Sequence, residues 1–262
     1  LIARHQSMEE AGAQASNIAR TIIHRTEAVG EQSAAAYQRL TGLDPSGTCS
    51  EAKRAQLRRI LLDYDHVQTA AYVSGDRIAC SAIGPQVDGM QMGPPAYVSP
   101  KGTRVHFPVS IDGSRPFVVL GDGHYATAVS PDSLLVESPS VPDLAQGVFG
   151  RSAGKVWAHH GHFDPAWLQQ HGKAPRTIFY DGHYLVAIED SQRFDVGAYA
   201  AIPRAWLIAR LRDLALVLLP VGLVLGAAMV GAIVLLARQR ASLPALLRAA
   251  LNRQEFVLYY QP

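Results

Sequence analysis

Cys49 and Cys80 are the only cysteines among the 262 residues of this chain. An even number of cysteines in an extracytoplasmic domain suggests one disulfide. Pairing would close a loop of about 32 residues, for which the chain-entropy estimate is about 3.7 kcal/mol of stabilisation. Three states remain open at this point: a disulfide that responds to redox conditions, a permanent structural disulfide, and two unpaired buried thiols.

The neighbours of Cys49 favour redox chemistry. Cys49 directly precedes Ser50, which we expect to cap a helix, and a helix N-terminus favours the thiolate, so that the thiol is easier to oxidise and exchange. Cys80 falls in the second strand of a predicted hairpin. A disulfide would therefore tie a helix to a sheet and could bias how the domain packs.

A histidine cluster offers a second chemistry. Residues 157–162 read Trp-Ala-His-His-Gly-His, with His171 and His183 further along the chain. In a strand, His160 and His162 would share a face, and imidazoles suit Zn²⁺ or Cu²⁺. The alternative is a set of solvated loop histidines that titrate near pH 6 to 7. We favour the second interpretation and expect no metal ion.

Other functional classes find less support. No nucleophile elbow or paired-carboxylate spacing points to a hydrolase. With 24 Lys and Arg against 22 Asp and Glu, the net charge of +2 argues against a nucleic-acid partner. A small-molecule receptor remains an alternative, with a pocket lined by Tyr97, Phe107, Phe117 and Tyr125.

One segment predicts a membrane span. Residues 214–237 carry no charged side chain over about 24 positions, which is enough to cross a hydrocarbon core of about 30 Å. Arginines flank both ends, and their count leaves the orientation undecided. Within the span, Gly222 and Gly226 form a Gly-x-x-x-Gly pair, which predicts a homodimer through this helix.

Hydrophobic periodicity predicts the elements before the span. A helical period runs over residues 5–40, ending at residues 44–47, and a second helix extends from the Ser50 cap to about Asp63. Hairpins are predicted over residues 67–83, 117–129 and 177–188, with further strands at 105–109, 154–162 and 196–202. The sequence Asp-Gly-His-Tyr at 122–125 and 181–184 is a matching turn and no evidence of domain duplication. This order predicts an α+β domain, a long helix and an antiparallel sheet, which is similar to PAS-like and Cache-like sensor modules.

The ends of the chain predict a larger protein. Residues 1–4, Leu-Ile-Ala-Arg, resemble the tail of an earlier membrane span, and the final Tyr-Tyr-Gln-Pro predicts a domain that continues. We therefore expect a sensor domain over 1–213, a transmembrane helix over 214–237, and a cytoplasmic linker with the start of a further domain over 238–262.

Two segments carry a family resemblance. Cys49 before a basic helix, followed by residues 72–82 and Gly84, resembles the CSS-motif domain of bacterial membrane-bound cyclic di-GMP phosphodiesterases. One departure is visible, because the family's Cys-Ser-Ser is Cys80-Ser81-Ala82 here. Residues 249–251 and 255–262 resemble the opening helix and first strand of an EAL phosphodiesterase domain.

The resemblance implies a multi-pass protein of the bacterial inner membrane, with a periplasmic sensor held between two membrane helices. In that family, the periplasmic disulfide-forming machinery oxidises the paired cysteines, the disulfide restrains the cytoplasmic EAL enzyme, and reduction releases it. The enzyme linearises cyclic di-GMP with Mg²⁺ or Mn²⁺. The carboxylates that hold this metal are absent from residues 1–262, so we expect no cofactor and no catalysis in this chain. The alternative is a small-molecule or metal-binding receptor whose disulfide is purely structural.

Overall fold

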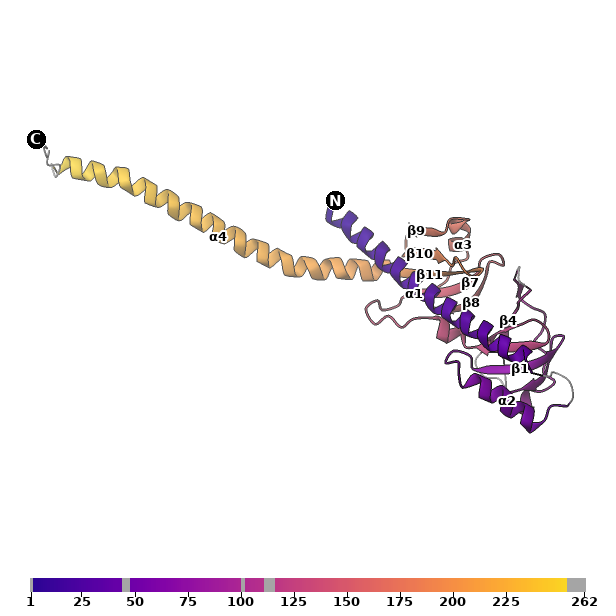
Figure 1. Ribbon diagram of the computed structural model, residues 1–262. Coiled ribbons are helices and arrows are strands. Elements are labelled where there is room, and N and C mark those ends of the chain that lie inside the picture. The colour runs from indigo at the N-terminus through magenta and orange to yellow at the C-terminus, as the bar shows by residue number, and fades with distance from the viewer. Residues whose placement is uncertain (1, 44–47, 100–101, 111–115, 254–262) are drawn as a thin grey trace, which may run out of the picture. The chain divides into compact units, whose positions relative to one another are not determined.

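The computed structural model describes residues 2–43, 48–99, 102–110 and 116–253, which form two compact units, Leu1–Leu207 and Ile208–Pro262. The first unit contains two antiparallel sheets that share one long helix (Figure 1). The helices are α1 (Ile2–Thr41), α2 (Glu51–Leu61), α3 (Ala166–His171) and α4 (Arg204–Asn252), with 3-10 turns η1 (Pro85–Val87) and η2 (Pro131–Leu134). The strands are β1 (Thr69–Ser74), β2 (Arg77–Ser81), β3 (Tyr97–Val98), β4 (Arg104–Ser110), β5 (Pro116–Gly121), β6 (Tyr125–Val129), β7 (Ala145–Gly150), β8 (Lys155–His160), β9 (Arg176–Tyr180), β10 (Tyr184–Asp190) and β11 (Val196–Pro203).

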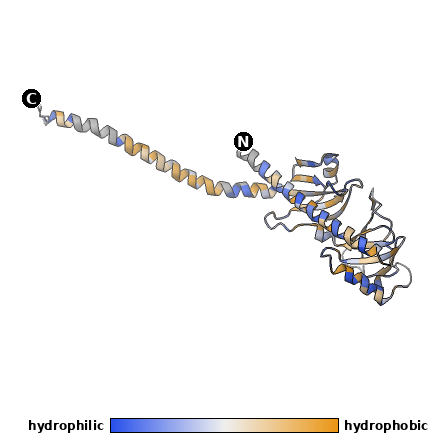
Figure 2. Cartoon of the chain, viewed as in Figure 1, coloured by the Kyte–Doolittle hydropathy of each residue, from blue (hydrophilic) through white to orange (hydrophobic). Residues whose placement is uncertain are grey.

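Helix α1 packs against both sheets. Polar and apolar residues alternate along it (Figure 2), and most of its buried residues lie three, four or seven positions from another, as expected for one face of a helix. The N-terminal part of this face joins a cluster on the second sheet, the middle packs between the sheets, and the C-terminal part covers the first sheet. The buried apolar residues of this face are Ala11, Ala15, Ala19, Ile22, Ile23, Val29, Ala36 and Leu40.

The two sheets follow the same strand order, with six strands in the first and five in the second. The first runs β2-β1-β6-β5-β4-β3 and the second β8-β7-β11-β10-β9. In each, a hairpin comes first in the chain, the strand furthest from it comes next, and the last strand pairs with the first strand of the hairpin. The single sheet expected from the sequence is therefore two sheets of repeated topology.

The repeated tetrapeptide Asp-Gly-His-Tyr does not occur at equivalent places in the two sheets. Residues 122–125 connect β5 to β6, whereas residues 181–184 connect β9 to β10, and these turns are not equivalent in the two sheets. Locally the turns match, because Asp122 and Asp181 each accept hydrogen bonds from the amides two and three residues later. Similar turns at different places confirm that the tetrapeptide is a local motif.

Most elements agree with the sequence prediction. The long helix, the capped helix, the three hairpins and the strands at 105–109 and 196–202 are confirmed within a few residues. Strands β3 and β7 and helix α3 were missed, and β8 ends at His160, earlier than expected. The expected helix stop at 44–47 and the EAL-like residues 255–262 lie outside the described residues.

Helix α4 contains a candidate membrane span in the region expected from the sequence. Among the described residues, one helix is long and apolar enough to cross a membrane, over Arg204–Arg238, and its most apolar window has a mean hydropathy of 2.5. The apolar stretch is continuous in Figure 2. The helix begins ten residues before the expected span, directly after β11.

Candidate functional site: a disulfide between helix α2 and the first sheet

Cys49 and Cys80 form a disulfide, with their Cα atoms 5.3 Å apart. Cys49 lies just before α2, and Cys80 lies in β2. Ser50 occupies the N-cap of α2, where its side chain accepts a hydrogen bond from the amide of Lys53. The predicted link between a helix start and a strand is thus present, and the state with two unpaired thiols is excluded.

The disulfide belongs to an apolar cluster, here called the disulfide cluster. Cys80 is 3% exposed and Cys49 is partly buried. The tyrosine rings of Tyr72 and Tyr125 lie 5.5 Å apart within the cluster, and Tyr37 of α1 contacts Tyr125 edge-on at 6.0 Å. The core of the cluster is Leu40, Leu57, Ala70, Tyr72, Cys80, Ala82 and Tyr125. The disulfide therefore joins α2, the first sheet and the end of α1 in one packed group.

A buried ion pair reinforces the same junction. Arg54 is 5% exposed, and its guanidinium binds both carboxylate oxygens of Asp88 and, at 3.0 Å, the carbonyl oxygen of Ser81. Asp88 also accepts the amide of Ser81 at 3.1 Å. Bidentate pairing of this kind is geometrically specific. Sequence analysis assigned Arg54 no role, because its partner lies 34 residues away in the chain.

The CSS residues have distinct surroundings. Ser81 is buried, and its hydroxyl accepts the amide of Ile83 at 3.2 Å. Ala82, where the family has its second serine, is 4% exposed inside the disulfide cluster, and its carbonyl accepts a hydrogen bond from Arg58 at 2.9 Å. Both backbone carbonyls after Cys80 are thus held by arginines of α2.

The histidine cluster does not form a shared strand face. His160 is the last residue of β8, Gly161 has φ of +73°, and His162 lies beyond the strand, where it stacks on Tyr184 at 5.4 Å. His171 is buried, and its two ring nitrogens form hydrogen bonds with Thr177 and Asp190. Among the residues that the structure describes, no group of three or more His, Cys, Asp or Glu side chains could hold a metal ion.

A cavity of about 710 Å³ lies between α1 and the first sheet. Of the four aromatic residues expected to line a pocket, Tyr97 lines it, whereas Phe117 and Tyr125 pack in other clusters and Phe107 packs beside the core. Trp157 also lines the cavity. Sequence analysis assigned Trp157 no role of its own, because the residues next to it in the chain do not show that the first sheet buries it.

In the second unit, Gly222 and Gly226 are exposed and line a shallow groove along α4 together with Gly231. Apart from the adjacent residues and backbone of α4 itself, no described atom lies within 4 Å of a Cβ built on any of these three glycines. The close helix approach that a Gly-x-x-x-Gly pair permits is therefore open on this surface.

Similar solved structures are sensor domains. The extracellular domain of rpHK1S-Z16, described as a histidine kinase, has a TM-score of 0.55 at 11% identity, covering 76% of this chain and 97% of that chain. The sensory domain of the Campylobacter jejuni chemoreceptor Tlp3 with isoleucine bound has a TM-score of 0.45 at 8% identity, covering 78% and 97%. The first of these likenesses, at 11% identity, concerns the fold alone, and together with the observed long helix and antiparallel sheets it confirms the expected PAS-like or Cache-like architecture.

The comparison with curated proteins gave no match. Among protein families, the one described as the CSS motif domain associated with EAL matches residues 11–215. This match covers most of the chain, including both cysteines, both sheets and the start of α4. The chain therefore belongs to the family of CSS-motif domains associated with EAL.

Proposed function

We propose that this chain is the redox-responsive periplasmic sensor region of a membrane-bound cyclic di-GMP phosphodiesterase, and that the Cys49–Cys80 disulfide restrains a cytoplasmic EAL enzyme. The observation that carries the proposal is the place of the disulfide. It ties α2 to β2 inside a cluster that includes the end of α1. Loss of the bond would remove the covalent link between α2 and β2 and leave only noncovalent contacts at this junction.

The difference in exposure between the two cysteines favours thiol–disulfide exchange by attack on the sulfur of Cys49. Cys49 is partly exposed and Cys80 is buried. A thiolate from a reductant would attack the sulfur of Cys49, forming a mixed disulfide and releasing Cys80 as a thiolate, and a second thiol would then reduce the mixed disulfide. The balance is two electrons and two protons delivered to the protein by the dithiol reductant.

A packed route leads from the disulfide to the start of α4. Leu40 of α1 lies in the disulfide cluster, and Ala11 of the same helix packs in a cluster with Leu207, in the first turn of α4. Both clusters belong to the unit Leu1–Leu207. A shift of α1 after reduction would thus be felt where α4 begins.

The proposal includes partners that lie outside the chain. The periplasmic disulfide-forming machinery would make the bond, α4 would cross the inner membrane, and a homodimer would form through Gly222 and Gly226. Cyclic di-GMP and Mg²⁺ or Mn²⁺ would bind to the EAL domain. The groove beside the two glycines and the family match support this arrangement.

The test is cyclic di-GMP hydrolysis by the full-length protein in membranes. We expect Cys49→Ser, Cys80→Ser and the double variant to raise hydrolysis to a similar level, because each of them removes the same bond. A thiol-trapping gel on wild-type protein taken directly from membranes should show oxidised and reduced forms together.

Ser50→Ala provides the matched control. It removes the cap of α2 and keeps both cysteines, so hydrolysis should stay near the wild-type level. Unchanged hydrolysis in both single cysteine variants would contradict the proposal. A fully oxidised population that resists mild reductant would identify a structural disulfide instead.

A further inference from the structure

The cavity between α1 and the first sheet has the features of a built binding site. Its volume of about 710 Å³ lies within the range of small-molecule pockets, about 300 to 1,000 Å³. One wall is the face of α1 that carries Val29, Ser33 and Tyr37, and the opposite wall is formed by β4, β5 and β6. Trp157 from the second sheet and Phe194 before β11 close one side.

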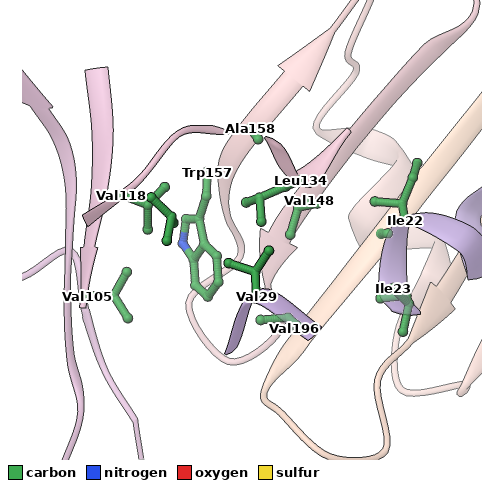
Figure 3. Packing of buried hydrophobic residues seen from close by; sticks show 12 residues of the cluster. Ile22, Ile23, Val29, Val105, Val118, Leu134, Val148, Trp157, Ala158 and Val196 are labelled. Atoms are coloured by element: carbon green, nitrogen blue, oxygen red, sulfur yellow. The ribbon is translucent and has the colours of Figure 1, made fainter. Parts of the chain in front are cut away.

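The walls are mainly apolar and aromatic. Figure 3 shows the indole of Trp157 between Val105 and Val118 of the first sheet and Val29 of α1, with the nitrogen edge of the ring turned toward the Val118 side. The ring of Tyr97 lies 6.4 Å from the ring of Trp157. Such walls suit a flat apolar body.

Two polar atoms in this lining have no hydrogen-bond partner. The hydroxyl of Ser33 and the indole Nε1–H of Trp157 are buried without a partner in the described chain, and the two residues are 4% and 6% exposed. Buried polar groups are nearly always paired, because an unpaired one is destabilising. A ligand that hydrogen-bonds to Trp157 and to Ser33 would satisfy both groups.

The charges around the cavity disfavour an anion. Asp122 accepts a hydrogen bond from Tyr37, and Asp195 accepts one from Tyr97. Both carboxylates belong to the lining of the cavity. Among the described lining residues, Arg193 carries the one guanidinium group, and this group is paired with Glu31. Asp195 also lies 3.8 Å from Nε of Arg151, so an anionic ligand would face the carboxylate of Asp122 without a free cation among the described lining residues to balance it.

We infer that this cavity binds a small organic molecule with an aromatic or other flat apolar body, a hydrogen-bond acceptor for Trp157 and Ser33, and no net negative charge. The site is separate from the disulfide chemistry. The part of the cavity that lies toward the disulfide cluster is lined by the hydrogen-bonded pair Tyr37 and Asp122. Tyr37 also contacts Tyr125 of the disulfide cluster.

The test uses three probes with one shared body: naphthaleneethanol, naphthaleneethylamine and naphthaleneacetate. Binding to the full chain in lipid nanodiscs is followed by ligand-observed NMR, with empty nanodiscs subtracted. We expect saturable binding of the alcohol and the amine, and at least about tenfold weaker binding of the acetate, which corresponds to about 1.4 kcal/mol.

Three variants locate the site. Trp157→Phe removes the N–H and keeps a ring, and Ser33→Ala removes the hydroxyl; each should weaken binding of the alcohol about two- to tenfold, the range for one hydrogen bond. Ser33→Ala removes no hydrogen bond made within the described chain and should keep or raise the melting temperature, whereas Trp157→Phe should lower it, because the smaller ring leaves a void in the core cluster around Trp157. Ser33→Leu, which fills the cavity, should abolish binding.

Ser16→Ala is the matched control on the same helix. Ser16 is also fully buried, but it donates to Glu189 and lies away from the cavity. This variant should lower the melting temperature and leave probe affinity unchanged. The inference is overturned if none of the three probes binds saturably, if the acetate binds best, or if Ser33→Ala and Trp157→Phe bind all probes as wild type does.

Discussion

At the residue scale, the Tyr37–Asp122 hydrogen bond joins the cavity to the disulfide cluster. Burial and the bond to Asp122 raise the pKa of Tyr37 to about 12. Burial alone would raise the pKa of Asp122, but hydrogen bonds from Tyr37 and from the amides of His124 and Tyr125 outweigh it and lower that pKa. Each partner thus favours the state in which tyrosine is neutral and aspartate is charged.

This pair predicts a pH dependence with a definite sign. The tyrosine pKa is about 10 in an unfolded chain, so the contribution of Tyr37 is complete below about pH 10 and is lost as pH rises toward 12. We expect Tyr37→Phe to lower the free energy of unfolding at pH 7 by about 1.5 to 3 kcal/mol. Urea unfolding near pH 7 and near pH 11 should show a difference between wild type and variant that shrinks at the higher pH. A constant difference would contradict the assignment.

Residue-level prediction from the sequence succeeded where a local rule or a simple count applied. Two cysteines allow one pairing, and Ser50 stands at a helix start, so both could be expected. The burial of Arg54 could not be predicted, because its partner Asp88 comes from a loop that is distant in the sequence. Most of the lining of the cavity was not predicted for the same reason, since tertiary packing alone brings Ser33 and Trp157 to the same cavity.

At the element scale, β7 shows why the second sheet was harder to find. All six of its residues are buried, so no alternation of polar and apolar positions marks it. Gly147 in this strand has no room for a side chain: a Cβ would lie 2.6 Å from Cε1 of Tyr199 and 2.7 Å from the carbonyl oxygen of Ala158. The glycine is required by the close approach of β8 and β11.

Gly147→Ala should therefore destabilise the first unit by about 1 to 3 kcal/mol, the usual range for overpacking. The carbonyl of Ala158 is part of the backbone and cannot rotate away. Gly42→Ala is the control, because its Cβ would make an ordinary contact at 3.4 Å. Thermal unfolding followed by circular dichroism compares the two variants, and equal melting temperatures would refute the packing argument.

At the scale of the whole molecule, the disulfide restricts the unfolded chain as well as the folded one. The cysteines are 31 residues apart in sequence. The loop-entropy relation gives about 3.7 kcal/mol for such a closure. We expect the double variant Cys49→Ser/Cys80→Ser to lose up to this amount in denaturant unfolding and to stay folded at room temperature, held by the Arg54–Asp88 pair. Loss of the folded state in the double variant would show that the bond is needed for the fold itself.

The sharing of α1 by the two sheets also determines when the domain can fold. Helix α1 is synthesised before every strand of the unit, yet part of its apolar face packs on β10 and β11, which are the last strands of the unit. The apolar face formed by Ala11, Ala15 and Ala19 stays exposed until Ala200 and Ile202 have been synthesised and pack on it. Contacts so distant in sequence slow folding, because a long loop must close before they form. The segment around Cys49 and Cys80 emerges well before those strands, so an oxidant can join the two thiols while most of the domain that they stabilise is still unmade.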